Sequence, residues 1–333
     1  GHSNQPGKPG TASIRMMHGD SPPLAVLQAF GWKPSLDIIS VPPGFSGAAV
    51  WKVTATTGSF ALKRWPSDFQ PDWQRITHLS MLAQQHGYHL LPVPHFTIQR
   101  QPYIKDQGVH WSACSWMTGQ PVATPNEEQL QTAMQSLAQL HRLWQRHAET
   151  ATGPSPSVQH QIMRLEAWTE AEYQQIARSS HPLHLQALAL LRSHRHSAIE
   201  RLRPWQLTPL PLHYVLGDVW AEHLLYTGDS LTGIIDLATI RLDHPAHDLA
   251  RLLGSYCAGD ARRRAQALEY YPHTDPHLES LTIALDEAGA IVALGNWLRW
   301  LVLENRPHLN HTAAHTRLQC LVNRLHRLTT TEF

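Results

Sequence analysis

Two short apolar runs, each followed by an aspartate, restrict the fold of this chain more than any other feature. The stretch VLGDVWAEHLLYTGDSLTGIIDLATI, residues 215–240, contains both aspartates, Asp218 and Asp236. Apolar runs of this length predict buried strands, and the intervening YTGDSLTG is typical of a turn. Acids placed after two buried strands indicate a binding or catalytic site. The alternative is a pair of solvent-exposed turn acids.

The length and charge of the chain exclude several classes of protein. A chain of 333 residues is expected to form two lobes. Lys and Arg (27) balance Asp and Glu (26), so no strong field favours nucleic acid. The longest apolar run, ALGNWLRWLVL, is too short and too interrupted to span a bilayer. We therefore expect neither a nucleic-acid partner nor a membrane span.

The cysteines and the first residues bear on the compartment. Cys114, Cys257 and Cys320 are odd in number and form no CxxC pair. This pattern argues against a disulfide framework and against a zinc–thiolate site, and it favours a reducing cytoplasm. The opening GHSNQPGKPGTASIR lacks the apolar core of a signal peptide. We expect residues 1–20 to be a flexible leader.

The first part of the chain has the pattern of an antiparallel sheet. Segments rich in β-branched and aromatic residues alternate with short turns that contain glycine. Five strands are expected, within residues 36–42, 48–55, 59–65, 92–98 and 103–117. One helix over 72–87 is expected to end at Gly87. Together these segments predict a compact N-terminal lobe over residues 21–118, to which the family resemblance given below assigns nucleotide binding.

After Gly119 the pattern becomes helical. The run ATPNEEQLQTAMQSLAQLHRLWQRH predicts a helix with Thr124 as its N-cap and Glu127 closing a capping box. Two further helices are expected within 159–203, and helical periodicity returns over 246–328. The sequence therefore predicts an α+β fold. Its larger, mainly helical lobe, residues 119–333, would hold the two acids, and the family resemblance given below also assigns the catalytic loop and the substrate pocket to it.

A β-rich lobe followed by a helical lobe with two acidic loops suits phosphoryl transfer. This chemistry requires a carboxylate near the acceptor hydroxyl, a second carboxylate that holds Mg²⁺, and a cation on the phosphates. Asp218 suits the first role and Asp236 the second. Lys63, in the strand-like FALKRW, suits the third.

The segment LGDVWAEHLLY…GIIDLATIRLDHPAHDLARL resembles the aminoglycoside phosphotransferase and choline kinase family. That family has His-Gly-Asp, an Asn after four further residues, an Ile-Asp strand end, and Asp-Pro-x-x-Asp-Leu-Ala. The resemblance covers roughly residues 36–305 and implies a protein-kinase-like fold of two lobes. It implies that Lys63 contacts nucleotide phosphates, Asp218 is catalytic, Asp236 binds the metal and Asp248 braces the catalytic loop.

The resemblance also implies where the nucleotide lies. The segment PPGFSGAAVWKV is similar to the hairpin that covers the nucleotide, which assigns Gly44, Ser46 and Gly47 to cofactor binding. Taken alone, GFSG is also typical of a plain hairpin turn. Ser115 and Met117 lie in the segment that meets the adenine. The expected cofactors are therefore ATP or GTP with Mg²⁺, or Mn²⁺ in its place.

Three positions depart from the family pattern. Leu216 replaces the His before the catalytic aspartate, and His223 replaces the Asn that supplies an oxygen ligand to the metal. Imidazole is a poor ligand for Mg²⁺ and suits Mn²⁺ or Zn²⁺ better. Arg75 stands where a glutamate would pair with Lys63. We expect a phosphotransferase that acts on a hydroxyl of a small amine- or sugar-like molecule. The alternative is a catalytically impaired, pseudokinase-like nucleotide binder or scaffold.

Trp297, Trp300 and Glu304 share one helical face in NWLRWLVLE. The choline kinase branch is similar in holding a cationic acceptor with aromatic and acidic groups. These residues are therefore candidates for the acceptor site, and the alternative is that the two indoles pack the helical core.

The histidines near the end of the chain form a second candidate cluster. His308, His311 and His315 recur at a spacing that places them on one helical face, which suits zinc. The alternative is that they are surface residues of a histidine-rich chain, which has 24 His.

Overall fold

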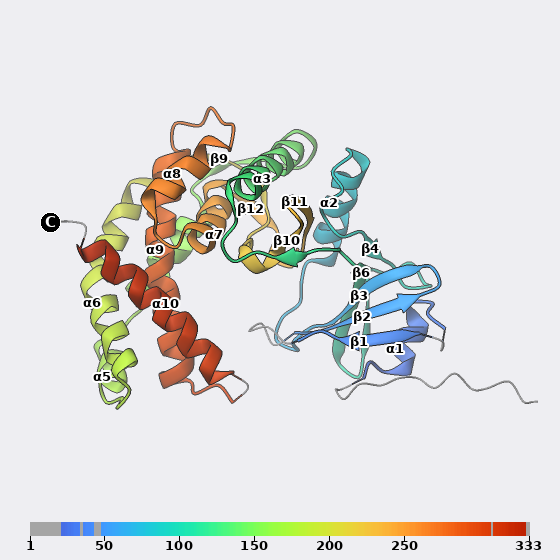
Figure 1. Cartoon of the computed structure of the whole chain (residues 1–333), viewed down its shortest axis with the longest axis horizontal. Helices are drawn as coiled ribbons and strands as arrows, with labels where there is room; N and C mark the ends of the chain where they lie inside the picture. Colours follow the sequence, from blue (N-terminus) through green and yellow to red (C-terminus); the bar gives the residue numbers. More distant parts are fainter. Residues whose placement is uncertain (1–20, 34–35, 43–47, 308, 331–333) are drawn as a thin grey trace, which may run out of the picture. The chain divides into compact units, whose positions relative to one another are not determined.

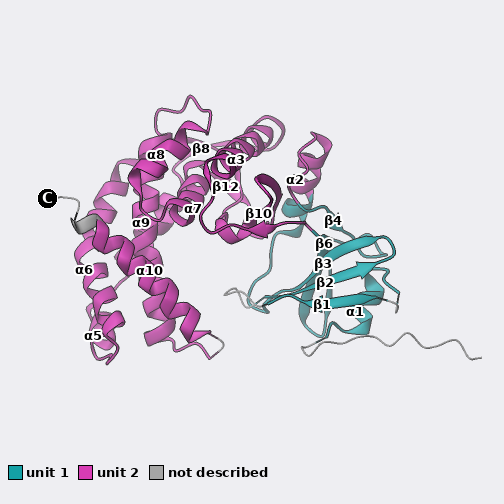
Figure 2. Cartoon of the chain, in the orientation of Figure 1, with its two compact units in different colours: residues 1–77, 92–116 teal, residues 78–91, 117–333 magenta. Residues whose placement is uncertain are grey.

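The computed structural model describes residues 21–33, 36–42, 48–307 and 309–330 (Figure 1). The expected leader, residues 1–20, lies outside them. The chain divides into two compact units, here called unit 1 and unit 2 (Figure 2). Unit 1 comprises residues 1–77 and 92–116, and unit 2 comprises residues 78–91 and 117–333. An antiparallel sheet dominates unit 1 and helices dominate unit 2, which confirms the predicted α+β class.

Unit 1 is built on a sheet of six antiparallel strands in the order β1-β2-β3-β6-β4, with β5 paired to β6. The strands are β1 (Asp37–Ser40), β2 (Ala49–Ala55), β3 (Gly58–Arg64), β4 (Pro94–His95), β5 (Tyr103–Asp106) and β6 (Val109–Ser115). The sequence predicted five strands, which is wrong by one. Gln107 and Gly108 both have positive φ, 47° and 78°, and they close a two-residue hairpin loop that splits the last predicted strand.

One face of this sheet packs against the short helix α1 (Leu24–Ala29). Trp51 and Val53 alternate with solvent-facing residues along β2, which gives the period of two expected for a half-buried strand. The indoles of Trp51 and Trp111 lie 5.4 Å apart, centroid to centroid, in the core of unit 1. This packing fixes the register of β2, β3 and β6, and Lys63 lies between Val50 and Ser112 in that register.

Helix α2 (Trp73–Gln85) contains the first division between the units, after Thr77. The helix ends at Gln85, and Gly87, the predicted stop, follows with φ +78° and donates its N–H to the Gln84 carbonyl. A glycine in the left-handed conformation is the usual way to end a helix, because it carries no Cβ to clash.

The long helix α3 (Glu127–His147) begins two residues later than predicted. Its N-cap is Asn126, not Thr124, and the capping box pairs Asn126 with Gln129 through two reciprocal hydrogen bonds. Asparagine ranks among the best N-cap residues, and its side-chain amide also donates to Asp229 at 2.8 Å. Leu130 and the residues that follow it at helical spacing are buried, so one apolar face of this helix packs into the core of unit 2.

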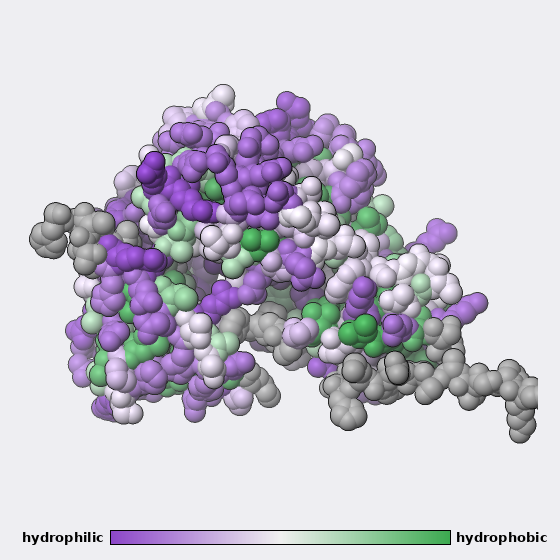
Figure 3. Space-filling model, viewed as in Figure 1, coloured by the Kyte–Doolittle hydropathy of each residue, from purple (hydrophilic) through white to green (hydrophobic). Residues whose placement is uncertain are grey.

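Seven further helices of unit 2 are α4 (Pro156–Glu166), α5 (Glu170–Ala177), α6 (Pro182–Leu202), α7 (Ala246–Cys257), α8 (Ala261–Glu269), α9 (Leu278–Leu298) and α10 (His311–Thr330). The prediction of two helices within 159–203 is corrected to three, because Thr169 caps a new helix, α5. Helix α9 packs against α6 and α7, and α10 packs against α6 and α9. Hydrophilic side chains cover much of their visible face (Figure 3). No helix in the described ranges is both long and apolar enough to cross a membrane.

Two three-stranded sheets of unit 2, ordered β11-β10-β7 and β12-β9-β8, hold the acidic loops. Their strands are β7 (Gln120–Pro121), β8 (Ala151–Gly153), β9 (Leu210–Val215), β10 (Leu224–Thr227), β11 (Ser230–Ile234) and β12 (Arg241–Asp243). Asp218 follows β9 and Asp236 follows β11, so both acids come directly after buried strands, as predicted.

Candidate active site

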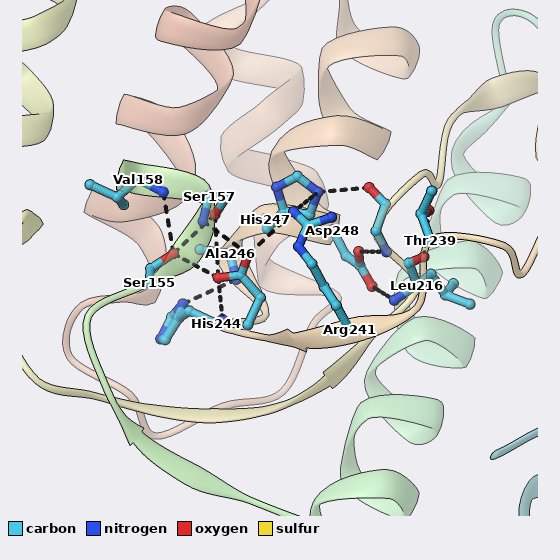
Figure 4. Close-up of polar contacts among 12 residues, drawn as sticks. Ser155, Ser157, Val158, Leu216, Thr239, Arg241, His244, Ala246, His247 and Asp248 are labelled. Carbon is cyan, nitrogen blue, oxygen red and sulfur yellow. Dashed lines mark hydrogen bonds and ion pairs between the residues drawn. The ribbon is translucent and has the colours of Figure 1, made fainter. Parts of the chain in front are cut away.

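The backbone of the loop after β9 is held by a buried aspartate of α7. Asp248 accepts the backbone N–H groups of Leu216 at 2.8 Å and Gly217 at 2.9 Å (Figure 4), and His141 Nε2 donates to it at 2.7 Å. Burial opposes the charge of Asp248, but the His141 hydrogen bond and the neighbouring histidines outweigh burial and lower the pKa of the carboxyl. The expected role of Asp248 as a brace of the loop that carries Asp218 is confirmed.

Gly217 adopts a conformation that only glycine tolerates at this place. Its φ is +85°, and an added Cβ would lie 2.3 Å from the backbone oxygen of Thr239. The His247 Nε2–H donates to the Gly217 carbonyl at 2.6 Å, and the Thr239 hydroxyl donates to the carbonyl of Leu216 at 3.2 Å (Figure 4). The loop therefore has hydrogen-bonded braces although Leu216 itself supplies none from its side chain.

The start of α7 is anchored by a second buried aspartate. Asp243, at the end of β12, accepts the Ser155 hydroxyl at 2.6 Å and the Ser157 backbone N–H at 3.1 Å (Figure 4). Ser155 is also the N-cap of α4. Because these bonds tie β12 to α4 immediately before α7 begins, they fix the helix that braces the loop.

Gly217→Ala is expected to lower the free energy of unfolding by about 2–4 kcal/mol, from left-handed backbone strain and the clash with Thr239. Gly228→Ala is the matched control, because Gly228 also has positive φ (+61°) but has no heavy atom within 4 Å of an added Cβ. The control is expected to cost about 1 kcal/mol. Urea unfolding of both variants checks the difference, and equal losses would refute the close approach at Gly217.

Asp218 lies at the surface of unit 2 and is oriented by α7. Its Oδ1 lies 2.6 Å from Nη2 of Arg251, which is one turn after Asp248 on the same helix. The side chains are 35% and 46% exposed, respectively, so the ion pair is weak in energy although it is short. Helix α7 therefore fixes the backbone of the loop and also orients its carboxylate.

His223 is oriented toward Asp236 by a hydrogen bond to the backbone. Its Nδ1 lies 2.7 Å from the Asp218 carbonyl oxygen, which can only accept, so Nδ1 carries the proton. In the neutral ring Nε2 then presents a lone pair, and it lies 3.5 Å from Oδ2 of Asp236. Two acceptors face each other, which is favourable only with a proton on Nε2 or with a cation between them.

The segment around Asp236 is held close to His223. The backbone N–H of Ile235 donates to the His223 carbonyl at 2.9 Å, and Asp236 has a left-handed φ of +69°. Non-glycine residues rarely adopt this conformation, and such residues gather at functional sites. The ligand atoms of Asp218, His223 and Asp236 lie within 4.8 Å of one another. Two carboxylates and one imidazole lone pair fit a divalent cation.

Lys63 lies on β3 of unit 1, and its ammonium lies 4.0 Å from the ring centroid of Trp65. Arg75 of α2, which stands at the position of the family's glutamate, forms an ion pair at 3.7 Å with Asp72, the residue before the helix. The remaining residues assigned to the nucleotide hairpin, Gly44, Ser46 and Gly47, lie outside the described residues. The assignment of Lys63 to the nucleotide phosphates stays a prediction.

The two residues predicted to lie near the adenine belong to different units. Ser115, in unit 1, donates its backbone N–H to the Val93 carbonyl at 2.8 Å, and its hydroxyl accepts the Val93 N–H at 2.8 Å. Met117, in unit 2, packs on Gly233, where an added Cβ would lie 2.9 Å from the Met117 Cβ. Their role in nucleotide binding also stays a prediction.

The aromatic groups predicted for the acceptor site contact a cation of the chain itself. Trp297 and Trp300 meet edge to face at 5.0 Å, and Arg306 lies 4.9 Å above the Trp300 ring. Glu304 pairs with Arg306 at 2.6 Å. Helix α9 changes here into the π-helical turn η3 (Arg299–Leu303), so Trp297 lies in α9, Trp300 lies in η3 and Glu304 follows it. A role in acceptor binding stays a prediction.

Sequence reasoning missed His141, His247 and Arg251 as parts of this site. His247 and Arg251 lie in HPAHDLARL, at one residue before and three residues after Asp248, so helical spacing alone places Arg251 beside it. His141 belongs to α3, far away in sequence, and no local pattern indicated its contact with Asp248.

Comparison with known proteins places this geometry in context. The family model described as the phosphotransferase enzyme family matches residues 37–281. A spectinomycin phosphotransferase in complex with ADP and spectinomycin has a similar structure, with 11% identity, 90% of this chain and 95% of that chain covered, and a TM-score of 0.65. An amicoumacin kinase in complex with AMP-PNP and Ca²⁺ is similar at 10% identity, with 89% of this chain and 93% of that chain covered and a TM-score of 0.62. An aminoglycoside phosphotransferase from Alicyclobacillus acidocaldarius is similar at 15% identity, with 95% of this chain and 96% of that chain covered and a TM-score of 0.56. The comparison with curated proteins found no match. At these identities the structures show the shared fold, which confirms the predicted kinase-like architecture.

Proposed function

This chain belongs to the phosphotransferase enzyme family, and from that premise we propose that it transfers a phosphoryl group from ATP or GTP to a hydroxyl of a small amine- or sugar-like molecule. One observation carries the proposal. The ligand atoms of Asp218, His223 and Asp236 come within 4.8 Å of one another. Buried hydrogen bonds hold the loop before Asp218, and a backbone hydrogen bond from Ile235 to His223 holds the segment around Asp236. The solved proteins of similar fold, named for small-molecule acceptors and for ADP or AMP-PNP, support the same assignment.

The roles follow from the chemistry of each side chain. Asp218 orients the acceptor hydroxyl and accepts its proton, because it is the exposed carboxylate that α7 positions. Asp236 and His223 would hold a divalent cation, which neutralises phosphate charge when it is bound. Lys63 is assigned to the phosphates of the nucleotide, and Ser115 and Met117 to its base. Catalysis of this kind depends mainly on positioning and charge neutralisation.

Two measurements test the proposal. Thermal-shift titrations with ATP and with GTP, each in Mg²⁺ and in Mn²⁺, show which nucleotide and metal bind. Turnover of the bound nucleotide across hydroxylated amines and sugars then identifies the acceptor class. Lys63→Met, which removes the charge but keeps an unbranched side chain, is expected to weaken nucleotide binding. No metal-dependent nucleotide binding under any of these conditions would refute the proposal, and binding without turnover would indicate the pseudokinase-like alternative.

His223→Asn is expected to raise Mg²⁺-supported kcat/KM, by up to about tenfold. The asparagine side chain offers an amide oxygen in place of an imidazole nitrogen, and Mg²⁺ prefers oxygen ligands. Assays in Mg²⁺ and Mn²⁺ check the effect, and the Mn²⁺ rate serves as the internal control because Mn²⁺ accepts imidazole more readily. An unchanged or lower rate in Mg²⁺ would contradict the assignment of His223 to the metal.

A further inference from the structure

We propose that His181, His184 and His315 form a second metal site in unit 2, for a divalent transition ion such as Zn²⁺. Their ligand atoms lie within 4.8 Å of one another. Among the described residues only one other group, Asp218, His223 and Asp236, reaches this proximity. The two groups share no residue, so the second site is separate from the proposed catalytic cluster.

Two helices bring the three histidines together. His181 is the N-cap of α6 and His184 lies in its first turn, so both face the same side. His315 lies on α10, and its Nε2 is 3.0 Å from Nε2 of His184. The three rings stack, with the centroid of His181 4.7 Å from each of the other two. The predicted zinc set of His308, His311 and His315 is not tested, because His308 lies outside the described residues. The histidines that lie near His315 as candidate ligands, His181 and His184, come from the start of α6.

The hydrogen bonds behind the rings present their Nε2 atoms as ligands. His315 Nδ1 lies 2.6 Å from the His311 carbonyl, which only accepts, so Nδ1 carries the proton and Nε2 keeps its lone pair. Without a metal, His184 Nε2–H donates the 3.0 Å hydrogen bond to His315 Nε2, and the Ser179 hydroxyl, 2.7 Å away, donates to His184 Nδ1. A bound ion would replace the bond between the two Nε2 atoms, and the Ser179 oxygen would then accept a hydrogen bond from His184 Nδ1–H. Metal-binding histidines usually have such an oxygen acceptor on the second ring nitrogen, because it fixes the tautomer and the ring orientation.

The ligand set selects the class of ion. Three imidazoles without a carboxylate suit Zn²⁺, Co²⁺, Ni²⁺ or Cu²⁺ and disfavour Mg²⁺, which prefers oxygen. With three protein ligands, a tetrahedral ion would keep one position for water.

His181 is the exchangeable ligand of the three. It is exposed, and its Nδ1 accepts the backbone N–H of Leu183 at 3.2 Å. Binding through Nε2 would place the proton on Nδ1 and release this capping bond. A bound ion would therefore cost the capping hydrogen bond between Leu183 and His181. In return it would link the start of α6 to α10 through the histidine ligands. The site would therefore fasten α10 to the start of α6.

Cobalt absorption and zinc calorimetry on the metal-stripped full chain test the proposal. We expect Co²⁺ to give visible d–d bands of a four-coordinate site, and Zn²⁺ to raise the melting temperature by about 5 °C at a hundredfold excess over Kd. In the Asp236→Asn background, which removes a ligand from the first group, His184→Gln and His315→Gln should abolish both effects, and His181→Gln should weaken Zn²⁺ binding about tenfold. Asp236→Asn should leave the cobalt bands in place, which separates this site from the proposed catalytic cluster.

His86→Gln is the matched control, because His86 stacks on His147 at 3.8 Å in an exposed pair outside both three-residue groups. This variant should retain the bands and the thermal shift. Because His181 is exposed, His181→Gln remains informative if a more buried variant fails to fold. The absence of four-coordinate cobalt bands, or binding that survives His184→Gln and His181→Gln unchanged, would overturn the proposal.

Discussion

Asp218→Asn is expected to lower the kcat of phosphoryl transfer by about 10²- to 10⁴-fold. Asparagine keeps the size of the side chain and can offer an oxygen to Arg251, which lies 2.6 Å from Oδ1 of Asp218. It cannot accept the proton of the acceptor hydroxyl, so the loss falls on the chemical step. Initial rates of ADP or GDP release at saturating acceptor measure kcat, and a thermal-shift titration measures nucleotide binding. Binding of the nucleotide is expected to change little.

Glu222→Gln is the matched control for this prediction. Glu222 lies in the same loop region and pairs with Arg317 at the surface, so its variant also neutralises one paired carboxylate. We expect it to retain the wild-type kcat, because exposed ion pairs contribute little. A similar fall in both variants would show that the rate responds to charge near the loop in general. Full activity of Asp218→Asn would refute the assignment of Asp218 as the catalytic base.

The sequence predicted the acids because their signal is local. The sequence around Asp218 and Asp236 shows an apolar strand followed by an acid. The structure confirms that Asp218 follows β9 and that Asp236 follows β11. The role of Asp248 as a brace was predicted from a motif whose spacing resembles that of a known family. His141 contacts Asp248 from another helix, so only the folded chain could reveal that side of the brace.

The errors in the fold have equally specific causes. The turn at Gln107 and Gly108 lies within one β-like run, so a continuous strand was predicted where two residues with positive φ reverse the chain. Thr124 and Asn126 are both residue types that can cap a helix. Asn126 is the N-cap in the structure, and its side chain also donates a hydrogen bond to Asp229, which is distant in sequence. Local sequence patterns indicate which turns and helix caps are possible. Contacts between segments distant in sequence determine which of them form.

Asp248→Ala is expected to lower the free energy of unfolding by about 3–5 kcal/mol. The carboxylate is buried, and its removal leaves the N–H groups of Leu216 and Gly217 and the Nε2–H of His141 without their acceptor. A buried donor without an acceptor bears the full cost of losing water. The loop that carries Asp218 should loosen as well, so kcat should fall with stability. Urea unfolding and initial rates of the same preparations measure the two losses.

Asp260→Ala separates the effect of burial from that of a lost hydrogen bond. Asp260 is an exposed N-cap of α8 that accepts the backbone N–H of Arg263 at 3.1 Å. Water can replace this hydrogen bond in Asp260→Ala. The free energy of unfolding should therefore fall by only about 1 kcal/mol, and activity should be retained. Because both variants remove an aspartate that accepts backbone N–H groups, the excess loss in Asp248→Ala measures the burial of the loop's donors. If the two variants lost equal stability, the loop would depend on contacts other than this carboxylate.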